Sequence, residues 1–219
     1  MITIPRSLFA FSVFYGGMVC LAGILANKQV AFFGLEVEAG IFAFILLVML
    51  SSTIAELHGR AVANRLVAFG FAPLVFSIFL TLFVLGLPVS PDMPPEQMER
   101  LDAFNVIMWA TPRIWVAGIF AYGVGQFLNV YIFSRLAAAT GRWVAIRGVV
   151  AGVLSQIVDT LIFITISFYG VFPIADLLVG QMLAKVVLAI FIVPVFIVGL
   201  VRFGRWLDAS APDQPDPQS

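Results

Sequence analysis

The residue that most clearly suggests chemistry is Asp159, because it is the only charged residue in an apolar stretch that covers residues 148–169. At about 1.5 Å per residue, a helix of this length crosses a hydrocarbon core about 30 Å thick, and Asp159 is expected near its middle. Ionisable groups at that depth are unfavourable unless they have partners, and they commonly mark functional sites. Asp159 is therefore our first candidate for binding a substrate.

Helical spacing places other useful groups on the same face as Asp159. Ser155 precedes it by four residues, Gln156 by three, and Phe163 follows it by four. A carboxylate can accept two parallel N–H bonds, amides can donate and accept, and aromatic rings can stack on a ring. This combination favours a flat, polar, hydrogen-bonding solute over a bare ion or a lipid.

A second polar face is expected on the segment that covers residues 112–133. Tyr122, Gln126 and Asn129 follow each other at i, i+4 and i+7, which places them on one side of a helix. We interpret them as further substrate-binding groups. The alternative is that they only form hydrogen bonds between helices, which contribute about 0.6 kcal/mol each on average in membranes.

Two basic residues fall within or at the edge of apolar segments, and both are candidates for gating or for pairing with the acids. Lys185 lies inside the last apolar segment and Arg113 begins the fourth. The alternative to a binding role for Asp159 is that it only forms an ion pair with Lys185 or Arg113. For Arg113, a side chain that reaches the membrane interface is the simpler alternative.

Glu56 is the remaining acidic candidate, because residues 52–56 and residues 155–159 share one pattern of hydroxyl, polar, Ile, small apolar and acid. If the chain consists of two three-helix halves, the two segments correspond and the halves are inverted, as in many transporters. We therefore predict that Glu56 and Asp159 line one cavity.

The elements that must position these groups are membrane helices. The chain has 219 residues, 62% of them hydrophobic and 11% charged, whereas soluble domains have about 25% charged residues. We predict an all-α, polytopic membrane protein of six transmembrane helices. The expected spans cover residues 7–26, 39–57, 66–87, 112–133, 148–169 and 175–201. Residues 1–207 form one domain, residues 208–219 a disordered cytoplasmic tail, and residues 88–102 a loop too polar to be buried.

The basic residues predict the orientation. Eight Lys and Arg residues fall on the side that holds both termini, and two fall on the other. Because cytoplasmic loops carry an excess of Lys and Arg, both termini are expected in the cytoplasm. We accordingly place the protein in the cell inner membrane.

Several classes of function have no support in the sequence. The balanced net charge argues against a nucleic-acid partner. No Cys/His cluster suggests a metal, and no cofactor motif is present. We find no H-E-x-x-H, G-x-S-x-G or phosphate-binding loop, so we expect a protein that is not an enzyme. Its expected partners are a small-molecule substrate and membrane lipid, and a homodimer is left open.

The chain resembles the queuosine precursor transporter family, a group of vitamin-uptake-type membrane transporters. The resemblance rests on ANKQVAFFGL, ELHGRAVANR, PRIWVAGIFAYGVGQFLNVYIFSRL, SQIVDTLIFITISFYG and residues 185–194. It implies a six-helix inner-membrane importer of 7-cyano-7-deazaguanine, of 7-aminomethyl-7-deazaguanine, or of both. The guanine-like edge of these compounds suits the carboxylate of Asp159.

Two positions depart from the pattern of that family. Asp is expected where this chain has Ser52 and where it has Asn129, so two negative charges are absent. Substrate choice or energy coupling is therefore expected to differ from that of other members.

Two other functions fit the same residues. The chain could be a substrate-binding membrane subunit for a vitamin-like solute, energised by a separate ATPase. It could also be a membrane scaffold whose buried polar groups only pack helices. The first predicts an ATPase partner, and the second predicts no binding of small molecules.

Overall fold

Five long apolar helices form the body of the protein in a computed structural model, which describes residues 4–32, 35–109, 112–137, 143–170 and 174–210. Each is long and apolar enough to cross a membrane. They lie close to the first five expected spans, although two of them begin several residues earlier than expected. The helices are α1 (Arg6–Leu25), α2 (Gly40–His58), α3 (Arg60–Leu85), α5 (Pro112–Arg135) and α7 (Val144–Phe168).

The sixth expected span is two helices and not one. α8 (Ala175–Phe191) and α9 (Val193–Ala209) meet at a bend of 45°. Pro194 lies in the first turn of α9. It cannot donate a backbone hydrogen bond to the preceding turn, and its ring displaces the carbonyl there, so the helix breaks at this point. Counted as one bent span, α8 and α9 complete the six crossings of a polytopic all-α fold.

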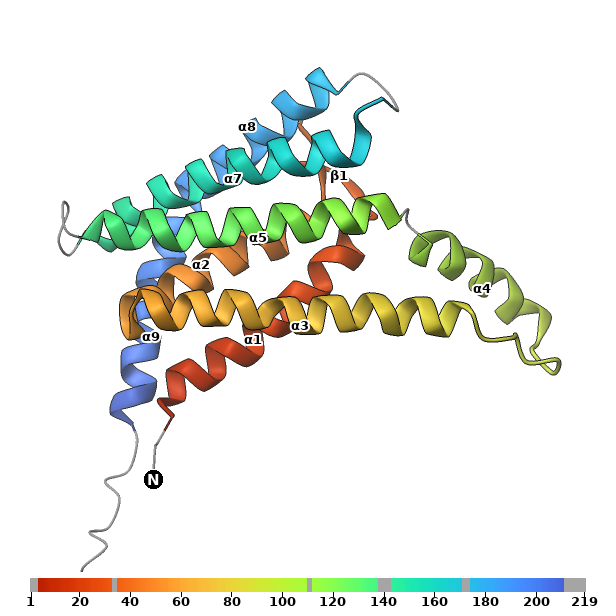
Figure 1. The fold of residues 1–219 in the computed structure, drawn as a ribbon, viewed down its shortest axis with the longest axis horizontal. Coiled ribbons are helices and arrows are strands. Elements are labelled where there is room, and N and C mark those ends of the chain that lie inside the picture. The colour runs from red at the N-terminus through yellow and green to blue at the C-terminus, as the bar shows by residue number, and fades with distance from the viewer. Residues whose placement is uncertain (1–3, 33–34, 110–111, 138–142, 171–173, 211–219) are drawn as a thin grey trace, which may run out of the picture.

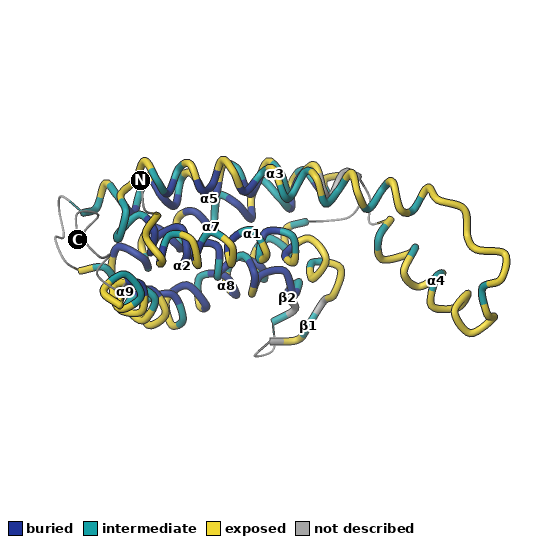
Figure 2. The backbone as a smooth tube through the Cα atoms, turned by 90° about the horizontal axis from the view of Figure 1, so that it is seen from below, coloured by how far each residue is buried: buried dark blue, intermediate teal, exposed yellow. Residues whose placement is uncertain are grey.

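Two connections contain secondary structure that the sequence analysis did not anticipate. Between α1 and α2, strands β1 (Gln29–Phe32) and β2 (Leu35–Glu38) form an antiparallel hairpin in which Val30 faces Val37. Between α3 and α5, helix α4 (Pro95–Met108) occupies much of the expected polar loop. It has no buried residue and projects from the bundle (Figure 2).

Both ends of the described chain lie at one end of the bundle, below left in Figure 1, which we call the terminal end. Arg6 Nη1 donates to the Ser210 carbonyl at 2.9 Å, and Ser7 Oγ donates to Asp208 Oδ2 at 2.7 Å. The opposite end carries the β1–β2 hairpin and is called the hairpin end. α9 continues through Ala209, past the expected boundary at 207; residues 211–219 lie outside the described part of the chain.

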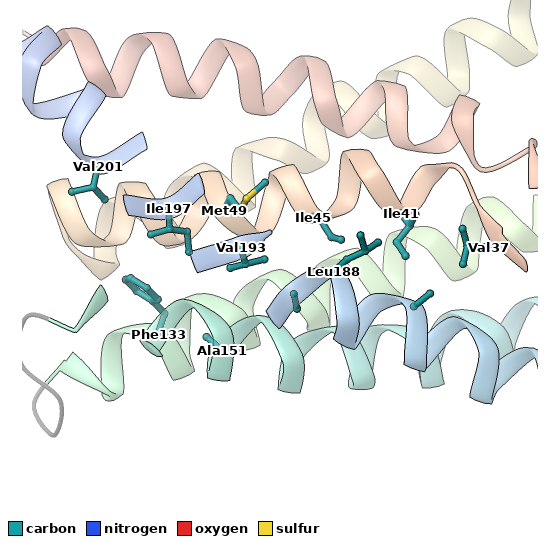
Figure 3. Packing of buried hydrophobic residues seen from close by; sticks show 12 residues of the cluster. Val37, Ile41, Ile45, Met49, Phe133, Ala151, Leu188, Val193, Ile197 and Val201 are labelled. Carbon is teal, nitrogen blue, oxygen red and sulfur yellow. The ribbon is translucent and has the colours of Figure 1, made fainter. Parts of the chain in front are cut away.

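α2 is the central helix, contacted by α1, α3, α5, α7, α8 and α9. Its residues Ile41 and Met49 pack against Leu188 and Ile197 of the broken helix in a continuous apolar core (Figure 3). A single residue, Gly59, joins α2 to α3 with a φ of 86°. Glycine adopts this conformation without the steric cost that a side chain would add, so two long helices can follow each other directly.

α3 differs from α2, because many of its large apolar side chains point away from the bundle. Phe69, Phe76, Phe79 and Phe83 are all exposed. In a chain of this composition such a surface is suited to lipid and not to water. The buried polar residues must therefore lie on the inner faces of the helices.

Candidate functional site

A cavity of about 130 Å³ lies inside the bundle near the hairpin end. At 10–15 Å³ for each water-sized probe, it has room for roughly ten water molecules, which suits a small solute. Residues from α1, β2, α2, α3, α4, α5, α7 and α8 line it. Its walls are mainly apolar, and the ionisable side chains among the described lining residues belong to Cys20, Glu38, Tyr122, Asp159 and Lys185.

Asp159 and Lys185 form an ion pair in the wall of the cavity. Lys185 Nζ donates to Asp159 Oδ2 at 2.6 Å, and the two side chains are 4% and 3% exposed. The other carboxylate oxygen, Oδ1, is buried and accepts no hydrogen bond from a described residue. Gly125 of α5 lies directly against it, and a Cβ there would come within 3.3 Å of Oδ1. Pairing with Lys185 is thus confirmed, and Asp159 Oδ1 is left with no donor among the described residues.

Two aromatic rings line the same cavity as this ion pair. Phe44 of α2 and Phe163 of α7 both line the cavity. Lys185 Nζ lies 5.6 Å from the centre of the Phe44 ring, within the range of a cation–π contact. A flat ring that entered the cavity would find both aromatic surfaces and ionic groups.

Glu38, at the end of β2, also lines the cavity and was missed by the sequence analysis. Its segment is too short and too mixed in character to register as a membrane element. Its backbone is paired with Gln29 across the hairpin, and β2 packs against α8, the helix that carries Lys185. A hairpin that folds back onto the bundle therefore places a second carboxylate beside Asp159 and Lys185.

A buried hydrogen-bond network continues from the cavity toward the terminal end. Tyr122 donates to the Val67 carbonyl at 3.0 Å, and its hydroxyl lies 3.1 Å from that of Tyr15. Tyr15 also lies 3.4 Å from Gln126 Oε1, which accepts from Ser51 Oγ at 3.2 Å. The expected polar face of α5 thus exists, and only Tyr122 of its three residues reaches the cavity.

Asn129 extends this network by one further turn of α5. Its Nδ2 donates to Ser51 Oγ at 2.9 Å and to Ser52 Oγ at 3.1 Å. Ser52 and Asn129, the two positions where the resemblance leads us to expect Asp, are therefore in direct contact. All three side chains are fully buried. This contact is neutral here, and it would bring two carboxylates together if both positions carried Asp.

The structure separates Glu56 from Asp159, contrary to the expectation that they line one cavity. Glu56 Oε2 accepts from Arg147 Nη1 at 2.8 Å, and Glu56 is not among the residues that line the cavity near the hairpin end. The reason is geometric: Glu56 is at the end of α2 that reaches the terminal end, whereas Asp159 lies in the second half of α7, which runs toward the hairpin end. Opposite placement of the two acids agrees with inverted halves, which remain a prediction.

Ser155 and Gln156 are not among the described residues that line the cavity. Ser155 Oγ donates to the Gly152 carbonyl of its own helix at 3.1 Å, and it is fully buried. Gln156 is buried one turn from Asp159, and its Oε1 has no hydrogen-bond partner among the described residues. Arg113 begins α5, but its side chain lies outside the described part of the structure.

Gly70 of α3 is required for the packing of the Tyr15–Tyr122 pair. A Cβ at this position would collide with the Tyr122 hydroxyl and would lie 3.0 Å from Tyr15 Cε1. Overpacking of a core typically costs about 1–3 kcal/mol. We expect Gly70→Ala to lower the thermal unfolding temperature of the purified protein, and Tyr122→Phe in the same chain to recover part of the loss, because the colliding oxygen is gone.

The control for this prediction is Gly17→Ala, because nothing lies within 4 Å of a Cβ at Gly17. It should change the unfolding temperature little. If Tyr122→Phe instead adds its own cost in full to that of Gly70→Ala, the collision is not the cause of the instability.

The fold and the cavity together define a multi-pass membrane transport protein, with polar groups enclosed by lipid-facing helices. Residues 38–199 match a family model described as "Putative vitamin uptake transporter". The match covers most of the chain, so the protein belongs to this transporter family. It is therefore a transport protein and not an enzyme, in agreement with the sequence analysis.

Curated relatives of this chain have names that specify a class of transported solute. The chain is 27% identical to a "Probable queuosine precursor transporter" of Bacillus subtilis (strain 168) over 164 residues, which cover 74% of this chain and 69% of the relative. It is 25% identical to the "Queuosine precursor transporter" of Escherichia coli (strain K12) over 166 residues, or 75% and 70% of the two chains. No solved structure gives a significant match. The resemblance seen in the sequence is thus confirmed.

Proposed function

We propose that this protein imports queuosine precursors of the 7-deazaguanine type across the cell inner membrane. The observation that carries the proposal is the cavity near the hairpin end, where the Asp159–Lys185 pair lies beside aromatic rings inside an apolar bundle. The names of the relatives from Bacillus subtilis and Escherichia coli support the class of solute. A small, flat heterocycle with N–H donors and a carbonyl oxygen has groups that complement each of these features.

Asp159 Oδ1, which has no donor among the described residues, is our candidate acceptor for the N–H edge of the solute. Lys185 keeps N–H donors beyond the one given to Asp159, and these can bond to a ring carbonyl. Phe44 and Phe163 offer ring faces for stacking. In this proposal Gln126 and Asn129 line the route beyond the cavity, and Gln156 and Ser155 support the segment of α7 before Asp159.

The two ends of the bundle differ in a way that suits import. The cavity lies near the hairpin end, and the charge bias of the loops predicts that this end faces outward. Toward the terminal end, the Glu56–Arg147 pair joins α2 to α7. Ser7 there lies 2.8 Å from His58 Nε2 and also donates to Asp208. We infer that the structure represents the state that receives the solute from outside.

The test is ligand binding by the full-length protein in detergent, measured as a shift in unfolding temperature. We expect 7-cyano- and 7-aminomethyl-7-deazaguanine to stabilise the protein and adenine to do so much less. A ligand at 100 times its Kd stabilises a protein by about 2.7 kcal/mol, which such a shift readily detects. No shift with either deazaguanine would contradict the proposed substrate. In a separate transport assay, uptake that requires a co-purifying ATPase would favour a subunit of a larger transporter.

A further inference from the structure

The two carboxylates of the cavity differ in what they contact. Asp159 is buried and accepts from Lys185 at 2.6 Å. The Glu38 side chain is only partly buried, it lines the cavity, and it forms no hydrogen bond or ion pair with another described residue. Its main chain is held by the hairpin register opposite Gln29. Glu38 is therefore a positioned carboxylate whose oxygens are available to a ligand.

The charges of the cavity do not balance when all three groups are ionised. Asp159 and Lys185 neutralise each other, so Glu38 leaves one net negative charge in a largely apolar site. Among the described residues, the other titratable ones that line the cavity are Tyr122 and Cys20, and Lys28 lies exposed at the start of the hairpin. An uncompensated carboxylate in such surroundings is unfavourable, and it is relieved either by a proton or by a cation.

We propose that Glu38 binds a protonated amino group of the transported solute, so that the cavity prefers a cationic heterocycle to a neutral one. This inference depends on the proposed function, since it concerns the same cavity. The arrangement assigns separate tasks to the two acids. Asp159, held by Lys185, faces the ring of the solute, and Glu38, held by the hairpin, faces its charged arm.

The acid–base behaviour of Glu38 agrees with this assignment. Burial raises the pKa of Glu38 from 4.5 to about 7; nearby Lys185 opposes the shift and nearby Asp159 adds to it. Below that pH a proton occupies the carboxylate and competes with the amino group of the ligand. Between pH 8 and pH 6 the ionised fraction falls about tenfold for a pKa near 7. The affinity for a cationic ligand should fall by a similar factor, and that for a neutral ligand should change little.

The test compares 7-aminomethyl-7-deazaguanine, which carries an amino group, with neutral 7-cyano-7-deazaguanine on the full-length protein. Calorimetric Kd values at pH 8 and pH 6 are measured for the wild type and for Glu38→Gln. Glu99→Gln, an exposed residue of α4, is the matched control. We expect Glu38→Gln to weaken binding of the amine at pH 8 by about tenfold, to leave the neutral ligand within about threefold, and to abolish the pH dependence.

Different failures have different meanings in this design. Wild-type protein that binds neither compound overturns the proposed function itself. Wild-type protein that binds both, with equal or no losses in Glu38→Gln, overturns only the role of Glu38. If Glu38→Gln does not fold, the wild type still decides, because affinity for the amine that does not change between pH 8 and pH 6 contradicts the proposal.

Discussion

Lys185→Met should unfold at a much lower temperature than the wild-type protein, because it leaves the Asp159 carboxylate buried without its cation. The pair is 2.6 Å apart and almost entirely excluded from solvent. Removal of one partner from a buried ion pair typically costs about 3–5 kcal/mol, whereas replacement of both by apolar residues is often neutral. Asp159→Leu combined with Lys185→Met should therefore recover much of the stability. Thermal unfolding in detergent measures both effects.

Transport assays on Asp159→Asn and on the double variant separate function from packing. We expect Asp159→Asn to reduce uptake of 7-deazaguanines at least tenfold, because a carboxylate that accepts N–H bonds becomes a neutral amide; a factor of ten corresponds to about 1.4 kcal/mol. The stable double variant should be equally inactive. Lys28→Met, an exposed residue near the hairpin, is the control for loss of a lysine. A double variant that is stable and still transports would show that the pair only packs α7 against α8.

Arg147→Met should produce a comparable loss of stability at the terminal end. The guanidinium donates to Glu56 at 2.8 Å and to the Phe133 carbonyl at 3.1 Å, and its Cζ lies 4.2 Å from the centre of the Phe133 ring. These contacts join the first turn of α7 to the ends of α2 and α5. We expect a loss of about 3 kcal/mol, because Glu56 is left mostly buried without its partner.

Two variants make this prediction specific. Arg135→Met removes an exposed arginine from the last turn of α5 and should change stability little. Arg147→Lys keeps the charge but lacks the planar group with several N–H donors, so it should fall between wild type and Arg147→Met. Equal unfolding temperatures for Arg147→Met and Arg135→Met would contradict an anchoring role.

Sequence patterns predicted the spanning helices well because hydrocarbon thickness fixes both their length and their apolar character. The features that were missed follow other rules. The hairpin has strands of only four residues, and α4 is a polar, exposed helix, so neither contains a long apolar run. The break between α8 and α9 did have a signal in Pro194, which a window average of hydropathy conceals.

Only part of the candidate site could be predicted from the sequence. Charges inside membrane helices are rare, so the sequence offered only Lys185 and Arg113 as ion-pair partners for Asp159, and the structure pairs it with Lys185. Glu38 could not be found in this way, because it lies between spans and reaches the cavity only through the fold of the hairpin. Glu56 was placed with Asp159 because the segments that contain them share a residue pattern, and such a pattern carries no information about the ion pair that Glu56 forms with Arg147.

The contacts between Ser7 and Asp208 have a consequence for biosynthesis. These residues are separated by 201 positions, and nearby Phe11 and Phe203 also pack their rings 6.4 Å apart. At about 5–20 residues per second, a ribosome needs roughly 10–40 s to translate the intervening chain. Helix α1 must therefore wait for α9 to be synthesised before its starting turn acquires these neighbours. Completion of the bundle is a late event in assembly, set by a contact of very long range and not by the local formation of helices.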